Sequence, residues 1–288
     1  MTPQVVLVTG CASGIGLCAA RRLAQDPDQR YLVIATVIAM SEKAELVAAV
    51  GDAIDKTIFI KEMNMTKDED ITRVVDDVIK AHGRIDILIN IAGITTLGVP
   101  ERVSRARIES IFNVNTIGTI RLTLAVLPHM KQKKAGRIIS VTSVDGVIGK
   151  PYNEIYCASK CAVEGFFESL LPAVKSFNIR VSMIEPNQVK TGMVLGAWME
   201  FKAQLSDNTI HDIDRRQLRC LAESSGKHPA YSADDVVDVL TKKCIEVDEP
   251  IFRHLLVSPD YQEKLVEVAN DLTGEKKIAL LCKDIGAS

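Results

Sequence analysis

Long apolar runs and paired cysteines are both missing from this chain of 288 residues. No apolar run reaches the roughly 18 residues that a membrane span needs, so we expect no transmembrane segment, and peripheral membrane contact stays open. The seven cysteines form no Cys-x-x-Cys pair and no Cys/His cluster with metal-ligand spacing, so we expect no metal site. The first strand-like run begins at Val5, which leaves no room for a signal peptide. We therefore expect a reducing, cytoplasmic location.

The chain also lacks a strong charge of either sign. Its 35 Lys and Arg residues nearly balance 37 Asp and Glu residues, for a formal net charge of −2. Such a balance gives no electrostatic reason to expect nucleic acid as a partner. The sequence shows no fixed-period repeat and no low-complexity segment. With 47% hydrophobic residues, the chain can bury a sizeable core, as a globular protein does.

Short apolar runs alternate with longer amphipathic segments along most of the chain. This alternation predicts a doubly wound parallel α/β sheet of the Rossmann type, with helices on both faces. The predicted strands are 5–8, 31–36, 57–60, 85–89, 137–141 and 179–184. The predicted helices are 14–25, 43–50, 67–82, 105–131 and 152–177.

The less regular tail belongs, in our interpretation, to the same domain. We predict one domain over residues 1–288, with a cofactor-binding and catalytic core at 1–192 and a substrate loop and irregular extension at 193–288. Within the extension, 232–247 is predicted to be helical and 252–257 to be an edge strand. The segment 192–229 has mixed signals and is a candidate lid.

A glycine-rich turn follows the first strand, between Thr9 and Gly16. Glycines are needed where the backbone turns tightly and approaches a pyrophosphate closely. The N-terminus of the next helix then presents free N–H groups and the positive end of its dipole to the anion. Because this cluster lies between a strand and a helix, it predicts a dinucleotide phosphate site.

A tyrosine and a lysine, Tyr156 and Lys160, are four residues apart on the predicted helix 152–177, so they lie on one face. A phenol is a weak base at neutral pH, but a nearby ammonium favours the phenolate and lowers its pKa. Such a tyrosine can exchange a proton with an alcohol or ketone while a hydride moves at a nicotinamide. Ser143 follows a predicted strand, where a parallel sheet has its ligand crevice. Asn115 is a polar residue inside an apolar helix and needs a partner.

The spacing Gly-x-x-x-Gly-x-Gly, with Asn115, Ser143 and Tyr-x-x-x-Lys in that order, resembles the short-chain dehydrogenase/reductase family. The segment 152–170 is closest to the branch that contains estradiol 17β-dehydrogenase type 1 and photoreceptor retinol dehydrogenase. The resemblance covers residues 1 to about 192. It implies that Ser143 orients the substrate oxygen, that Tyr156 is the acid/base and that Lys160 binds the nicotinamide ribose. It further implies that Asn115 holds a water that relays protons to Lys160.

The resemblance also implies which residues bind the cofactor. They are Thr9, Gly10, Ser13, Gly14, Ile15, Gly16, Asn64, Met65, Asn90, Ala92, Gly93, Tyr156, Lys160, Pro186, Val189 and Thr191. Three positions depart from the family pattern. Asn64 replaces an aspartate but keeps an acceptor oxygen for the adenine amine, and Ile91 replaces an asparagine. Asn187 replaces a glycine, and asparagine tolerates a positive φ there.

Few residues in the sequence indicate whether NAD(H) or NADP(H) is the dinucleotide. No acid ends the second predicted strand to hold a ribose diol, which counts against NAD(H). The branch's arginine for the NADP phosphate falls at about Ile38. Analogy with the branch slightly favours NADP(H) over NAD(H).

These observations together predict an NAD(P)-dependent enzyme that oxidises a secondary alcohol or reduces a ketone, with a lipophilic steroid or retinoid as the expected substrate. One alternative is a reductase of small carbonyl compounds. Another is a cofactor-binding regulatory protein without catalysis, which the departures at Asn64, Ile91 and Asn187 favour and the four intact catalytic positions oppose. The resemblance also implies a homodimer or homotetramer, formed through the helices that carry Asn115 and Tyr156.

Overall fold

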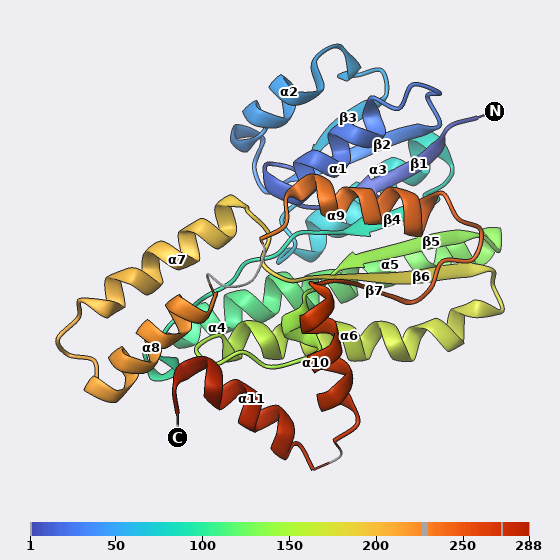
Figure 1. Ribbon diagram of the computed structural model, residues 1–288. Coiled ribbons are helices and arrows are strands. Elements are labelled where there is room, and N and C mark those ends of the chain that lie inside the picture. The colour runs from blue at the N-terminus through green and yellow to red at the C-terminus, as the bar shows by residue number, and fades with distance from the viewer. Residues whose placement is uncertain (1, 226–229, 272, 288) are drawn as a thin grey trace.

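A parallel sheet of seven strands forms the centre of the structure, a computed structural model in which residues 2–225, 230–271 and 273–287 are described (Figure 1). The strand order is β3-β2-β1-β4-β5-β6-β7, and every neighbouring pair is parallel. The strands are β1 (Gln4–Val8), β2 (Tyr31–Val37), β3 (Ile58–Glu62), β4 (Ile87–Asn90), β5 (Gly136–Val141), β6 (Ile179–Pro186) and β7 (Arg253–Leu256). The order reverses direction between β1 and β4, which is where a doubly wound sheet binds its ligand. The predicted fold class is confirmed.

Helices cover both faces of the sheet because its strands are apolar on both sides. In β1, Val6 and Val8 join the core cluster on one face, while Val5 and Leu7 join the cluster on the other. The first cluster is closed by α1 (Gly14–Ala24), α2 (Ala44–Val50) and α9 (Ala233–Val239). The second is closed by α3 (Asp68–His82), α5 (Thr119–Lys133) and α6 (Glu154–Lys175). Burial on both faces explains why these strands read as continuous apolar runs rather than as alternating ones.

The helix predicted at 105–131 forms, but it is not regular throughout. It consists of α4 (Arg105–Phe112), a π-helical turn at Asn113–Gly118 and α5. The whole stretch Arg105–Lys133 is long and apolar enough to cross a membrane by length and composition, although half of its most apolar window is buried in the fold. A mostly buried core helix passes the same test, so this stretch carries little weight as a membrane span.

The C-terminal part is more helical than predicted. The candidate lid forms two helices, α7 (Gly192–Leu205) and α8 (Asp212–Ser225), and its last residues, 226–229, lie outside the described residues. The extension ends in α10 (Pro259–Ala269) and α11 (Glu275–Ile285). Figure 1 shows α7, α8 and α11 grouped beyond one end of the sheet, and α8 contacts both of the others. The predicted edge strand is present as β7, and the predicted helix 232–247 forms as α9 followed by a π-helical turn, Leu240–Ile245.

Candidate active site

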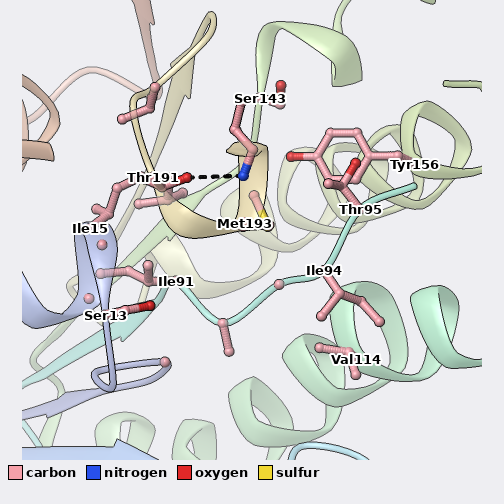
Figure 2. Close-up of a pocket in the computed structure, with 18 of the residues that line it drawn as sticks. Ser13, Ile15, Ile91, Ile94, Thr95, Val114, Ser143, Tyr156, Thr191 and Met193 are labelled. Carbon is pink, nitrogen blue, oxygen red and sulfur yellow. Dashed lines mark hydrogen bonds between the residues drawn. The ribbon is translucent and has the colours of Figure 1, made fainter. Parts of the chain in front are cut away.

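A cavity of about 390 Å³ opens at the carboxyl ends of the central strands. The glycine-rich turn after β1 lines one part of it. The ends of β2, β4, β5 and β6, the residues after β3 and part of α7 line other parts. Figure 2 shows Ser13, Ile15 and Ile91 on one side of this pocket and Ser143 and Tyr156 on the other. The cavity therefore joins the predicted phosphate site to the predicted catalytic residues.

The glycines of the turn after β1 are required by close backbone contacts. Gly10 has a φ of +72°, and a Cβ atom there would lie 2.9 Å from the Cα of Ala92. A Cβ on Gly16 would lie 2.1 Å from the carbonyl oxygen of Gly10. Ser13 precedes α1 in extended conformation, and its side chain makes no capping hydrogen bond. The first N–H groups of α1 are thus available to an anion at the cavity.

Three side chains from two elements meet at the other end of the cavity. Ser143 follows β5 and begins the short 3-10 turn Val144–Gly146, while Tyr156 and Lys160 lie one turn apart on α6. All three are buried and line the cavity. The Nζ atom of Lys160 lies 5.6 Å from the centre of the Tyr156 ring and donates to the carbonyl oxygen of Val141 at 3.3 Å. Tyr156 and Lys160 therefore lie close together, as their four-residue spacing in the sequence predicts.

Asn115 lies behind this group, in the π-helical turn. Its Nδ2 donates to the carbonyl oxygen of Ile94 at 2.9 Å and to Ser159 Oγ at 3.0 Å, and its Oδ1 accepts from the Ile94 N–H at 2.8 Å. A Cβ on Gly93 would lie 3.4 Å from Asn115 Oδ1 and 3.7 Å from Lys160 Nζ. Asn115 and Lys160 therefore approach the same small space beside Gly93, although Asn115 does not line the cavity itself.

The protonation of Tyr156 differs from the sequence expectation. Burial raises the pKa of the Tyr156 phenol above its ordinary value, and the nearby charge of Asp145 raises it further, while a hydrogen bond with Ser143 lowers it. The expected lowering of this pKa by the Lys160 ammonium is not seen. Lys160 is itself desolvated, and burial lowers its pKa to about 8 against the opposing charges of Glu164 and Asp145. The raised pKa of Tyr156 favours the protonated phenol, which is the form that donates a proton.

Most of the predicted cofactor-binding residues line the cavity. They are Gly10, Ser13, Gly14, Ile15, Gly16, Asn64, Met65, Ala92, Gly93, Tyr156, Lys160, Pro186, Val189 and Thr191. Two predicted residues do not line it. Thr9 Oγ1 accepts from the N–H groups of Ile91 and Ala92 at 2.9 and 3.0 Å, and Asn90 Nδ2 donates to Thr123 Oγ1 at 3.3 Å. These hydrogen bonds hold the end of β4 and the loop that follows it in place.

Two departures from the family pattern behave differently from our expectation. Asn64 Oδ1 accepts two hydrogen bonds from Thr66, at 3.0 Å from its N–H and 2.8 Å from its hydroxyl. Both lone pairs of that oxygen are thereby engaged, so the expected contact with an adenine amine is not supported. Asn187 does not have a positive φ, unlike five other non-glycine residues of the described chain. Its N–H donates to the carbonyl oxygen of Leu256 at 3.0 Å, so β7 sets this turn.

Comparison with known proteins agrees with this geometry. Residues 4–199 match the short chain dehydrogenase family. The chain belongs to that family. Its members are NAD(P)-dependent oxidoreductases that act on CH–OH groups.

Among related proteins, retinol dehydrogenase 8 from Bos taurus is 42% identical over 189 residues, which is 66% of this chain and 60% of that protein. Human retinol dehydrogenase 8 is 37% identical, over 83% of this chain and 78% of that protein. Human 17-beta-hydroxysteroid dehydrogenase type 1 is 33% identical, over 88% of this chain and 77% of that protein. A short-chain dehydrogenase structure from Streptomyces avermitilis superposes with a TM-score of 0.78 at 23% identity, over 97% of this chain and 98% of that one, and shares the fold. The predicted branch is confirmed.

The cavity of this dehydrogenase also contains polar residues that the sequence interpretation missed. Lys150, Asn153 and Thr95 line it near Tyr156, and Glu42 lines it beyond β2. Lys150 and Asn153 precede Tyr156 in the loop before α6, so proximity in sequence was an available signal. Glu42 had none, because it comes after β2 in a short 3-10 turn, Met40–Glu42, whose path the sequence does not indicate. Apolar side chains, among them Leu97, Val114, Met193 and Trp198, complete the wall.

Proposed function

We propose that this chain transfers a hydride between a nicotinamide dinucleotide and a secondary alcohol or ketone, with Tyr156 as the acid/base. The observation that carries the proposal is the continuity of one cavity. It connects a glycine turn at a helix N-terminus to the buried group Ser143, Tyr156 and Lys160. When bound, the reduced dinucleotide would supply the hydride for ketone reduction, and the oxidised dinucleotide would accept it during alcohol oxidation.

The chain's own residues divide the remaining work. The hydroxyl of Ser143 orients the substrate oxygen, and the neutral Tyr156 gives that oxygen a proton during ketone reduction. Lys160 holds the ribose next to the nicotinamide. Asn115, which shares the space beside Gly93 with Lys160, positions a water that exchanges protons with it. Alcohol oxidation runs the same proton path in reverse.

The substrate is, in our proposal, a lipophilic steroid or retinoid. The apolar part of the cavity wall, including Leu97, Ile94 and Trp198, supports this proposal, as do the names of the retinol and 17-beta-hydroxysteroid dehydrogenases among the relatives. A small carbonyl compound is the second candidate, favoured by the polar residues Lys150 and Asn153 in the same wall. The intact catalytic group opposes a purely regulatory, non-catalytic protein.

NADP(H) is the proposed dinucleotide, on the strength of the branch resemblance, but with weak discrimination against NAD(H). Ile38 occupies the branch's arginine position and is 51% exposed. The charged side chain that lines this part of the cavity is Glu42. A carboxylate there repels a ribose phosphate and can accept hydrogen bonds from a ribose diol. We therefore expect NADP(H) to bind only slightly more tightly than NAD(H).

Assembly and location complete the proposal. Ile117 and Leu124 are 45% and 49% exposed on the helical stretch that carries Asn115, which supports a homodimer or homotetramer through that surface. We place the protein in the cytoplasm, where reduced cysteines are expected, with peripheral contact at a membrane as one route to a lipophilic substrate. We treat residues 1–192 as the catalytic core and 193–288 as the part that shapes the substrate site.

The test is a fluorescence titration of the purified protein with NADPH and with NADH, followed by a panel of steroids, retinoids and small ketones. We expect saturable binding below millimolar concentrations and turnover of at least one lipophilic alcohol or ketone. If neither dinucleotide binds in that range, the oxidoreductase proposal is wrong. Turnover of small ketones alone would select the second candidate.

A further inference from the structure

A carboxylate lies inside the substrate half of the cavity, beside the catalytic group. Asp145 is two residues after Ser143, and its backbone N–H donates to Ser143 Oγ at 3.1 Å. Its Oδ2 accepts a hydrogen bond from Asn153 Nδ2 at 2.9 Å. Asn153 is three residues before Tyr156, and both Asp145 and Asn153 line the cavity. The carboxyl group is therefore held in place on the wall where the substrate oxygen is expected.

The charge of Asp145 reaches the reacting groups. It raises the pKa of Tyr156, second only to burial, and it counters the lowering of the Lys160 pKa. Desolvation raises the pKa of the Asp145 carboxyl as well, and the residue is partly buried. Because Asp145 lines the cavity, it is part of the electrostatic environment of the site.

No cation pairs directly with this carboxylate. Among the described residues, no lysine or arginine forms an ion pair with Asp145, and Lys150 and Lys160, which line the same cavity, act on it through their charges. A partly buried carboxylate with one amide donor is stabilised when a cation or further donors contact it directly. A ligand in the cavity can supply that cation.

We propose that Asp145 favours, among lipophilic alcohols and ketones, those that carry a protonated amino group close to the reacting carbon. The inference rests on the proposed function, because Ser143 and Tyr156 fix where the reacting oxygen lies. With that oxygen held by the two hydroxyl groups, Asp145 is placed to bind a cation a few bonds away. Apolar side chains of the cavity wall, among them Leu97 and Trp198, then contact the rest of the molecule. A retinoid or a steroid without an amine would bind through this apolar wall alone, and therefore less tightly than an amine of similar size.

Two ligands that differ only in the amino group test this proposal. Norephedrine is a secondary alcohol with an ammonium group on the adjacent carbon, and 1-phenylpropan-1-ol, called phenylpropanol below, is the same molecule without the amine. Their dissociation constants are measured by calorimetry on the full chain, with and without reduced dinucleotide, so that no turnover interferes. We expect norephedrine to bind about 10- to 100-fold more tightly, as for a hydrogen bond to a charged group.

Three variants define the origin of that preference. Asp145→Asn keeps an oxygen that can accept from Asn153 but loses the charge, and it should bind the two ligands equally. Asp76→Asn removes one exposed carboxylate from α3, away from the cavity, and should keep the full preference. Lys150→Met removes one of the two lysines whose charges act on Asp145, leaves the catalytic Lys160 in place and should increase the preference for norephedrine.

The outcomes separate this inference from the proposed function. Equal binding of both ligands by the unmodified chain, or an unchanged preference in Asp145→Asn, overturns the inference. If the chain oxidises phenylpropanol and does not prefer norephedrine, the oxidoreductase stands and Asp145 is not selective. If Asp145 gives a preference for norephedrine but the chain oxidises no alcohol, the cation-binding role of Asp145 stands and the proposed function fails.

Discussion

The two ends of the cavity differ in how closely they follow the pattern of the family. At the proton-transfer end, Ser143, Tyr156, Lys160 and Asn115 are all present, buried and grouped. At the adenosine end, Ile38 is half exposed, Glu42 lines the wall and Asn64 uses its oxygen to bind Thr66. The chain therefore keeps the family's catalytic residues more completely than the residues that choose between NADP(H) and NAD(H).

A physical reason accompanies this difference. Proton transfer needs groups within hydrogen-bond reach of one another, so a displacement of about 1 Å can remove much of the rate. Dinucleotide binding at the adenosine end is distributed over many contacts, and each contributes little. We accordingly expect substitutions to have large effects at the first end and modest effects at the second.

The largest effect is expected from Tyr156→Phe. Removing the hydroxyl should lower kcat about 100- to 10,000-fold, as is typical for loss of a general acid, while the dinucleotide dissociation constant changes little. Steady-state kinetics and fluorescence titration measure the two quantities. Tyr31→Phe removes a hydroxyl from another buried tyrosine, at the start of β2, and should leave kcat unchanged. Substantial activity in Tyr156→Phe would contradict the role that we assign.

Lys160→Met should affect both binding and rate. Because Lys160 is proposed to hold the ribose, we expect the dinucleotide to bind about 10-fold more weakly, in addition to a fall in kcat. The charge of Lys160 is lost as the pH rises through about 8, so binding to the unmodified chain should weaken over that range. The variant should show no such pH dependence. Lys61→Met, which disrupts a surface pair with Asp77, serves as the control.

At the adenosine end, Glu42→Lys should change the choice of dinucleotide. Replacing a carboxylate with an ammonium should improve the affinity for NADPH relative to NADH about 10-fold, since one charged contact with a phosphate is gained. The ratio of dissociation constants measures the effect. Glu45→Lys makes the same charge change three residues later, on an exposed position that does not line the cavity. An equal shift in both variants would show that only net charge matters.

The smallest expected effect is on the pH dependence of the thermal stability of the fold, through Glu185. Glu185 is fully buried beside Arg253 and close to Glu164, and burial raises the pKa of Glu185 to about 7. Its contribution to stability is present below the pKa of the unfolded chain and is lost as the pH rises through about 7.

Glu185→Gln removes this titration, so its Tm should rise relative to the unmodified chain between about pH 5 and about pH 8. Scanning calorimetry measures the difference. The exposed Glu249→Gln should give a difference that does not change over this range. A constant difference for Glu185→Gln as well would mean that Glu185 stays ionised in the fold.

The sequence predicts the fold well where short-range patterns decide it. Continuous apolar runs locate the strands, and the spacing of Tyr156 and Lys160 places them on one helix face without knowledge of tertiary contacts. Glycine positions such as Gly10 and Gly16 are predictable because only glycine fits between touching backbone segments.

The rest depends on tertiary context. The pKa of Tyr156 follows from desolvation and from Asp145, and neither is visible in a helical spacing. Asn187 needs no positive φ because β7 binds its N–H, and that strand comes from far along the chain. The helices α7, α8, α10 and α11 have limited buried faces, such as Leu218 and Leu221 in α8, so their periodicity alone predicts them weakly.

Isotope transfer tests the central claim most directly. The chain is incubated with a ketone that it reduces and with dinucleotide deuterated at the transferable hydride position, and mass spectrometry locates deuterium in the alcohol. The account predicts one deuterium on the carbinol carbon with the unmodified chain and almost none, over the same time, with Tyr156→Phe, although both bind the dinucleotide. Equal deuterium transfer by the two proteins, or an alcohol without deuterium, would contradict it.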